Sequence, residues 1–154
     1  MTMRDVSFLN GTVTFRAPAQ WKESFDEDGT IVLFQTKPFR ATLRLTTVTS
    51  RLPLNLWENN ALHLMSSEKD HPNCVVEPLP GDRVLNTYSS RGGSDEHPTI
   101  LHFWHIGSLQ PEHHWLQAIF SLTFDLKDQG FAGANDILHV IDREVRDAKL
   151  PAAN

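Results

Sequence analysis

Apolar and polar residues alternate with a period of two through most of this chain, and this alternation constrains its fold more than any other feature. Successive side chains of a strand point to opposite faces, so each alternating run predicts a β-strand with one buried face. The runs are GTVTFRAP, WKESF, TIVLFQT, ATLRLTTVTS, CVVEPL, DRVLNTYSS and the two halves of residues 100–120. Because these strands mostly follow one another without helices between them, the sequence predicts an antiparallel sheet.

Two segments have helical spacing instead. From Pro53 to about Lys69, apolar residues recur every three or four positions, and Pro53 suits the first turn of a helix. These residues are Leu54, Trp57, Ala61, Leu64 and Met65. A second helix is predicted from about Asn135 to Ala148, with Asn135 or Asp136 as its N-cap. The apolar face of this helix contains Ile137, Leu138, Val140, Ile141 and Val145.

The predicted order is four strands, a helix, four strands and a helix. We therefore expect one α+β domain over residues 1–154, with an antiparallel sheet of about seven or eight strands in two meanders. One helix lies between the meanders and one at the C-terminus. Trp21 and Trp57 are expected in the core. Glu144 falls inside the apolar arc of the second helix, and we expect it at a rim with its carboxylate in water.

Charge and composition exclude several classes of function. A net charge of -5 without a basic cluster argues against nucleic-acid binding. No apolar run reaches the roughly eighteen residues of a membrane span, and the N-terminus has no secretory signal. The lone Cys74 has no partner for an internal disulfide, which suits the cytoplasm, and it is expected to be a small buried residue.

Residues 100–120, ILHFWHIGSLQPEHHWLQAIF, hold the densest set of residues that can bind metals or ligands. His102 and His105 have H-x-x-H spacing, but residues three apart on a strand point to opposite faces, so the pair does not chelate one ion. The H-E-x-x-H spacing of helical zinc proteases is absent, and so is a cysteine pair for a zinc knuckle. We expect no metal and no cofactor on these residues alone.

If the two halves of this region pair as a β-hairpin, histidines from both strands can lie on the same face of the sheet. A symmetric pairing places Trp104 opposite Trp115 and His105 opposite His114. One face then carries Leu101, Phe103, His105, His114, Leu116 and Ala118, and the other carries His102, Trp104, Ile106, His113, Trp115 and Gln117. A slip of one residue mixes these two sets, because it turns one strand over relative to the other.

The second face is the candidate site, with His102, Trp104, His113 and Trp115 as candidate residues for binding a partner or a ligand. An alternative is that the tryptophans lie in the core beneath a helix, with the histidines at its edge. A metal or catalytic site is a third alternative, which needs more ligands than two histidines. Asp95, Glu96 and His97 in the neighbouring loop are available for that role.

Other catalytic patterns are missing from the sequence. It contains no G-x-S-x-G elbow, and Gly92-Gly93 lies in a polar loop without the following helix that a phosphate cradle needs. The acidic residues are concentrated in turns and on helix surfaces rather than as a pair in a cleft. These observations favour a protein that is not an enzyme.

The order of elements, and the opening VTFRAPAQW in particular, resembles the PsbP-like superfamily. Phe15, Pro18 and Trp21 match its Phe-x-x-Pro-x-x-Trp pattern, Gly29 matches its first hairpin, and LTFDL precedes its closing helix. This superfamily includes the photosystem oxygen-evolving subunit, a Ran-binding nuclear import factor, and DcrB-type and secretion-effector chaperone proteins of bacteria. The chain departs from the thylakoid and lipoprotein members because it has no signal peptide or lipobox. No binding residue of the family is carried over.

The resemblance implies an adaptor, chaperone or assembly factor, although fold alone does not fix function. The leading hypothesis is thus a non-enzymatic cytoplasmic protein that acts through protein–protein contacts, with no nucleic-acid or membrane partner. An oligomer is compatible with this role. The alternative is a small-molecule or metal-binding protein, with or without enzyme activity, that uses the His/Trp face of the hairpin. It requires at least three of Glu96, His97, His102 and His113 to converge in a pocket.

Overall fold

The computed structural model describes residues 1–52 and 73–151, so the helix predicted from Pro53 to about Lys69, which includes Trp57, lies outside the described residues. The described strands are β1 (Met3–Phe8), β2 (Val13–Pro18), β3 (Lys22–Phe25), β4 (Ile31–Gln35), β5 (Ala41–Arg51), β6 (Val75–Leu79), β7 (Arg83–Gly93), β8 (Pro98–Gln110) and β9 (His114–Asp125). Two 3-10 turns, η1 (Pro111–His113) and η2 (Leu126–Asp128), flank β9, and the helix α3 (Ala132–Arg146) follows.

Seven of these strands form one antiparallel sheet in the order β3-β4-β5-β9-β8-β7-β6, which confirms the predicted α+β class with an antiparallel sheet. The strand β2 is not part of it. It pairs instead with β1, with Val6 opposite Phe15, in a separate two-stranded sheet. The strand β1 is not among the predicted strands, although its buried Val6 and Phe8 alternate with exposed Asp5 and Ser7.

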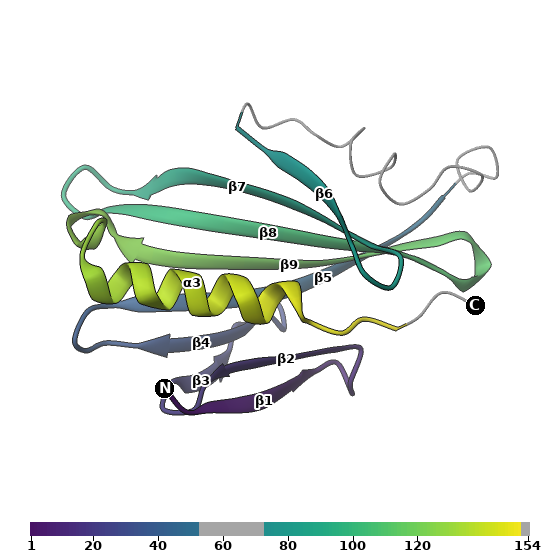
Figure 1. Ribbon diagram of the computed structural model, residues 1–154, viewed down its shortest axis with the longest axis horizontal. Coiled ribbons are helices and arrows are strands. Elements are labelled where there is room, and N and C mark those ends of the chain that lie inside the picture. Colours follow the sequence, from purple (N-terminus) through teal and green to yellow (C-terminus); the bar gives the residue numbers. More distant parts are fainter. Residues whose placement is uncertain (53–72, 152–154) are drawn as a thin grey trace.

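The large sheet has an inner face, which α3 and the β1-β2 hairpin cover, and an outer face opposite. Figure 1 shows α3 in front of β5 and β9, with the hairpin on one side of the helix and β6, β7 and β8 on the other. The main core lies between these layers. It includes Phe15, whose ring meets Phe120 edge-on at 5.1 Å, and Trp21, which is buried as predicted.

The helix α3 begins at Ala132, three residues before the predicted start, and Phe131 stands at its N-cap position without a side-chain cap. Ile137, Ile141 and Val145 are buried against the core, as predicted from their spacing.

The expectation for Glu144 is wrong, because the side chain is buried rather than immersed in water. Its carboxylate oxygens lie 3.9 Å from Arg16 Nε of β2 and 3.3 Å from Arg143 Nη2. A buried carboxylate is costly unless it is paired, and these two arginines supply the pairing. The sequence could not indicate this, because Arg16 comes from a strand far away along the chain.

The polar loop predicted between the strands of the β7–β8 hairpin is shorter than expected. The strand β7 continues to Gly93, which pairs with Pro98, and only residues 94–97 form the turn. Gly93 has a φ of +77°, and a Cβ atom there would collide with the His97 carbonyl oxygen. In the described residues, no helix combines the length and apolar character that crossing a membrane requires.

Candidate functional site

The predicted register of the β8–β9 hairpin is wrong. Trp104 pairs with Phe120 rather than with Trp115, and Leu109 is the residue opposite Trp115. The two strands are joined by the tight turn η1, in which Glu112 adopts a φ of 62°. The partner of Trp104 moves from position 115 to position 120. Because this shift is an odd number of residues, it turns β9 over relative to β8.

The two tryptophans therefore lie on opposite faces of the sheet. Trp104 is 3% exposed, belongs to the main core beneath α3, and donates a hydrogen bond from Nε1 to Asp142 Oδ1 of the helix at 2.9 Å. Trp115 is 1% exposed and packs against Val84 in a smaller cluster on the outer face. Its indole Nε1 has no hydrogen-bond acceptor among the described residues. The four candidate side chains consequently do not share one face.

Of the candidate histidines, His102 lies on the inner face beside Trp104. It is partly buried, its ring centroid lies 6.2 Å from that of Phe124, and burial lowers the pKa of its imidazole. His105 lies on the outer face, where its ring nitrogens are 2.9 Å from Tyr88 Oη and 3.3 Å from Gln117 Oε1. The side chain of His113 lies outside the described part of the structure.

A metal site would need at least three suitable ligands close together. Residues 1–52 and 73–151 contain no group of three His, Cys, Asp or Glu side chains placed to hold an ion. Glu96 and His97 are exposed in the turn between β7 and β8, and they do not line the groove that contains His102. Cys74 is buried, as predicted for a small apolar side chain.

His102 and Trp104 line an open groove of about 290 Å³ on the part of the inner face that α3 leaves uncovered. We call this the α3 groove, and define it by Val75, Ser89, His102, Trp104, Leu138 and His139. The helix forms one wall through Leu138 and His139, and the beginning of the edge strand β6 forms the other through Val75. Figure 1 shows this arrangement, with β6, β7 and β8 extending beyond the helix.

A charged network closes one end of the groove. Arg146 donates from Nε to both carboxylate oxygens of Asp142 at 3.0 Å, and from Nη1 to Glu77 Oε1 of β6 at 2.7 Å. Burial by itself lowers the pKa of Arg146, but its hydrogen bonds to Glu77 and Asp142 outweigh burial and raise that pKa above its ordinary value. One arginine faces two carboxylates here, so the network keeps a net negative charge at this end of the groove. The rest of the groove presents the apolar side chains of Val75 and Leu138 beside two imidazoles.

A neighbouring arginine attaches the end of the helix to the sheet. Arg83 of β7 donates from Nη1 to the carbonyl oxygens of Arg146 and Ala148, at 2.9 and 2.6 Å, and from Nε to that of Pro80. The last carbonyls of a helix lack partners within it, so Arg83 satisfies groups that would otherwise need water.

Sequence reasoning found His102 and Trp104 but missed the rest of the α3 groove. The spacing of Asp142 and Arg146 is a local signal for an ion pair on one face of a helix. Nothing local connects Arg146 to Glu77, because the sheet topology alone brings β6 to the helix.

Comparison with known proteins bears on the fold only. No family model matches the chain, and no curated protein matches its sequence. Among solved structures, a protein from Bacteroides thetaiotaomicron VPI-5482 is similar, with a TM-score of 0.55 and 13% sequence identity over 75% of this chain. The match covers 39% of that protein, so the chain spans well under half of its length. A likeness at this identity supports the α+β fold and says nothing about function.

Proposed function

We propose that this chain is a non-enzymatic binding protein, adaptor-like or chaperone-like, which holds a segment of a partner protein in the α3 groove. The observation that carries the proposal is the strip of the inner face between α3 and β6, which no element of the described residues covers. Val75 of β6 is an apolar side chain that is 57% exposed at the edge of this strip, next to the partly buried Leu138 of the helix. Exposed apolar surface beside well-packed, buried side chains is typical of a site for a partner's side chain.

The shape of the groove favours an extended partner segment over a compact ligand. The groove is shallow, it is open to solvent, and it lies between a helix and an edge strand rather than in an enclosed cavity. The edge strand β6 contains Pro78, and Pro80 follows it, so continuous strand addition along this edge is disfavoured because proline lacks an N–H donor. We therefore expect recognition through side chains in the groove rather than through strand pairing.

A relationship to the PsbP-like superfamily is part of the same proposal. It is supported by the order of the elements and by the places of the residues that carry the resemblance. Phe15 and Trp21 are both buried in the main core between the hairpin and the large sheet. Membership would agree with an adaptor or assembly role, since that is what the superfamily implies.

Selection from a displayed random-peptide library tests the proposed function. Two variants make the selection specific: Val75→Asp in the groove, and Val48→Asp on the outer face of β5, where Val48 is 49% exposed. Selected peptides should bind the wild-type and Val48→Asp chains alike, and bind Val75→Asp at least about tenfold more weakly. Peptides that bind all three chains equally, or a selection that yields no peptide dependent on Val75, would contradict the proposal.

A further inference from the structure

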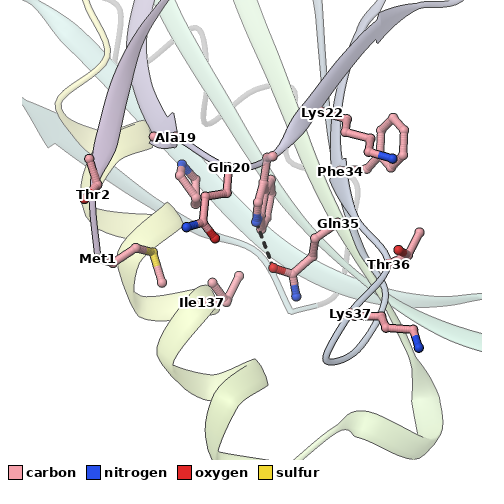
Figure 2. A pocket seen from close by; sticks show the side chains of 12 residues that line it. Met1, Thr2, Ala19, Gln20, Lys22, Phe34, Gln35, Thr36, Lys37 and Ile137 are labelled. Atoms are coloured by element: carbon pink, nitrogen blue, oxygen red, sulfur yellow. Dashed lines mark hydrogen bonds between the residues drawn. The ribbon is translucent and has the colours of Figure 1, made fainter.

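A second cavity, of about 490 Å³, lies at the opposite end of the inner layer, where the β1-β2 hairpin, the beginning of β3 and the end of β4 meet α3. Figure 2 shows the side chains that surround it. We call it the Trp21 cavity, and its walls are formed by Met1, Pro18, Gln20, Trp21, Gln35 and Ile137. The volume lies within the range of small-molecule sites, and the cavity does not touch the α3 groove.

The walls of the Trp21 cavity are held in place before any ligand binds. Trp21 donates from Nε1 to Gln35 Oε1 at 2.9 Å, and Gln35 donates from Nε2 to the Phe39 carbonyl oxygen at 2.9 Å. A backbone turn, in which Trp21 N donates to the Pro18 carbonyl oxygen, fixes the corner of the cavity. Figure 2 shows the bond between Trp21 and Gln35 as the dashed line. Fixed walls reduce the entropy that a ligand must overcome to bind.

The same bonds determine which wall groups remain available to a ligand. Each end of the Gln35 amide already makes one hydrogen bond within the protein, and Trp21 has used its only donor. The side chains of Thr2, Gln20 and Thr36, by contrast, have no hydrogen-bond partner within the described residues. Trp21, Ile137 and Pro18 present apolar surface to the cavity. The cavity thus combines an apolar interior with free polar groups around its opening.

Charge distinguishes the cavity from the rest of the chain. The residues that line it include Lys22 and Lys37 but no aspartate or glutamate, whereas the chain as a whole carries a net charge of -5. Both lysines are exposed, and neither forms an ion pair within the described residues. In Figure 2 their stems lie at the rim and point away from the cavity, so their ammonium groups would act at its mouth. This local excess of positive charge favours an anion over a cation.

We propose that the Trp21 cavity binds a small amphipathic carboxylic acid. The apolar body of the acid packs between Trp21, Ile137 and Pro18, and its carboxylate lies at the mouth near Lys22 and Lys37. This binding site is independent of the partner segment in the α3 groove.

Titration of the ¹⁵N- and methyl-labelled chain with decanoate, followed by NMR, tests this inference. Decanol and decylamine serve as the neutral and cationic comparison ligands. We expect the signals of the Ile137 methyl groups and the Trp21 indole to shift in proportion to decanoate, with weaker binding of decanol and the weakest of decylamine. Equal binding of all three ligands would overturn the assignment to acids, and the absence of shifts at Ile137 and Trp21 would overturn the site.

Two pairs of variants test separately whether decanoate occupies the cavity and whether the two lysines strengthen its binding. Gln20→Trp fills the exposed entrance, and should weaken decanoate binding at least about tenfold, whereas Gln129→Trp, at an exposed position that does not line the cavity, should not change it. Replacing both Lys22 and Lys37 with Gln should weaken decanoate binding about two- to fivefold without affecting decanol, whereas Lys127→Gln should affect neither ligand. Thermal unfolding of each variant checks that it remains folded. Unchanged decanoate affinity in Gln20→Trp would contradict the proposal.

Discussion

His102 gives the inner face a dependence on pH. Burial lowers the pKa of its imidazole in the folded chain, while the unfolded chain keeps a value near the ordinary 6.5. As the pH falls through 6.5, the unfolded state therefore takes up the proton first, and the free energy of unfolding decreases. His139 and the Asp142–Arg146 pair on α3 face the same groove, and Arg146 pairs with Glu77 as well as with Asp142.

We predict that the wild-type chain loses stability between pH 7.5 and 5.5, and that His102→Gln removes part of this loss. Urea unfolding at several pH values measures it, with His139→Gln as the control, because His139 lies on the same groove but is exposed on the helix. A pH dependence that is identical in wild-type and His102→Gln chains would show that burial does not control this imidazole.

Trp104 and Trp115 provide a matched test of one buried hydrogen bond. Trp104→Phe removes the bond to Asp142, and should cost about 1–3 kcal/mol of unfolding free energy. Trp115→Phe removes a similar volume but no bond to a described residue, so it should cost less. Urea unfolding of both variants gives the comparison. Equal losses would mean that the bond from Trp104 to Asp142 contributes nothing.

At the level of the elements, Arg83 connects the end of α3 to the sheet. Arg83→Ala leaves the carbonyls of Arg146 and Ala148 without this donor, and should lower the free energy of unfolding by about 1–3 kcal/mol. Hydrogen exchange should accelerate at the amides of Asp147 and Lys149, which follow the helix. Arg91→Ala, at an exposed position on the same strand, is the control. Unchanged exchange at the helix end would exclude this role of Arg83.

The register of β8 and β9 decides which side chains share a face, and NMR measures it directly. We expect cross-strand nuclear Overhauser effects between backbone protons of Trp104 and Phe120, and between those of Leu109 and Trp115. Effects between Trp104 and Trp115 would instead support the symmetric pairing that the sequence suggested, and would rule out the α3 groove as described.

The sequence predicted the strands well because alternation is a local signal that each strand carries by itself. ATLRLTTVTS, for example, coincides with most of β5, and Leu43 and Leu45 are buried as its pattern indicated. It predicted that β8 pairs with β9 but not their register, because GSLQPEHH is compatible with several turns and the choice depends on backbone conformation at Glu112. Nor did it predict that Glu144 is buried, because the arginine that faces it belongs to β2.

On the scale of the whole molecule, the inner layer covers the large sheet unevenly. The helix and the β1-β2 hairpin cover β4, β5 and β9, which leaves the Trp21 cavity beside β3 and the α3 groove beside β6. Both candidate binding sites thus lie near the two edge strands of the sheet, β3 and β6. Figure 1 shows these two strands on opposite sides of α3. Where the second layer ends, exposed apolar side chains such as Val75 lie beside the packed inner face of the sheet.

The most direct test of the account is the place where a library-selected peptide binds. Tryptophan indole N–H signals are resolved in a ¹⁵N spectrum, and Trp104, Trp21 and Trp115 report on the α3 groove, the Trp21 cavity and the outer face, respectively. We predict that the peptide shifts the indole signal of Trp104, together with the amides of Val75 and Leu138, and leaves those of Trp21 and Trp115 unchanged. A peptide that shifts Trp115 or Trp21 while Trp104 stays constant would contradict the proposed function.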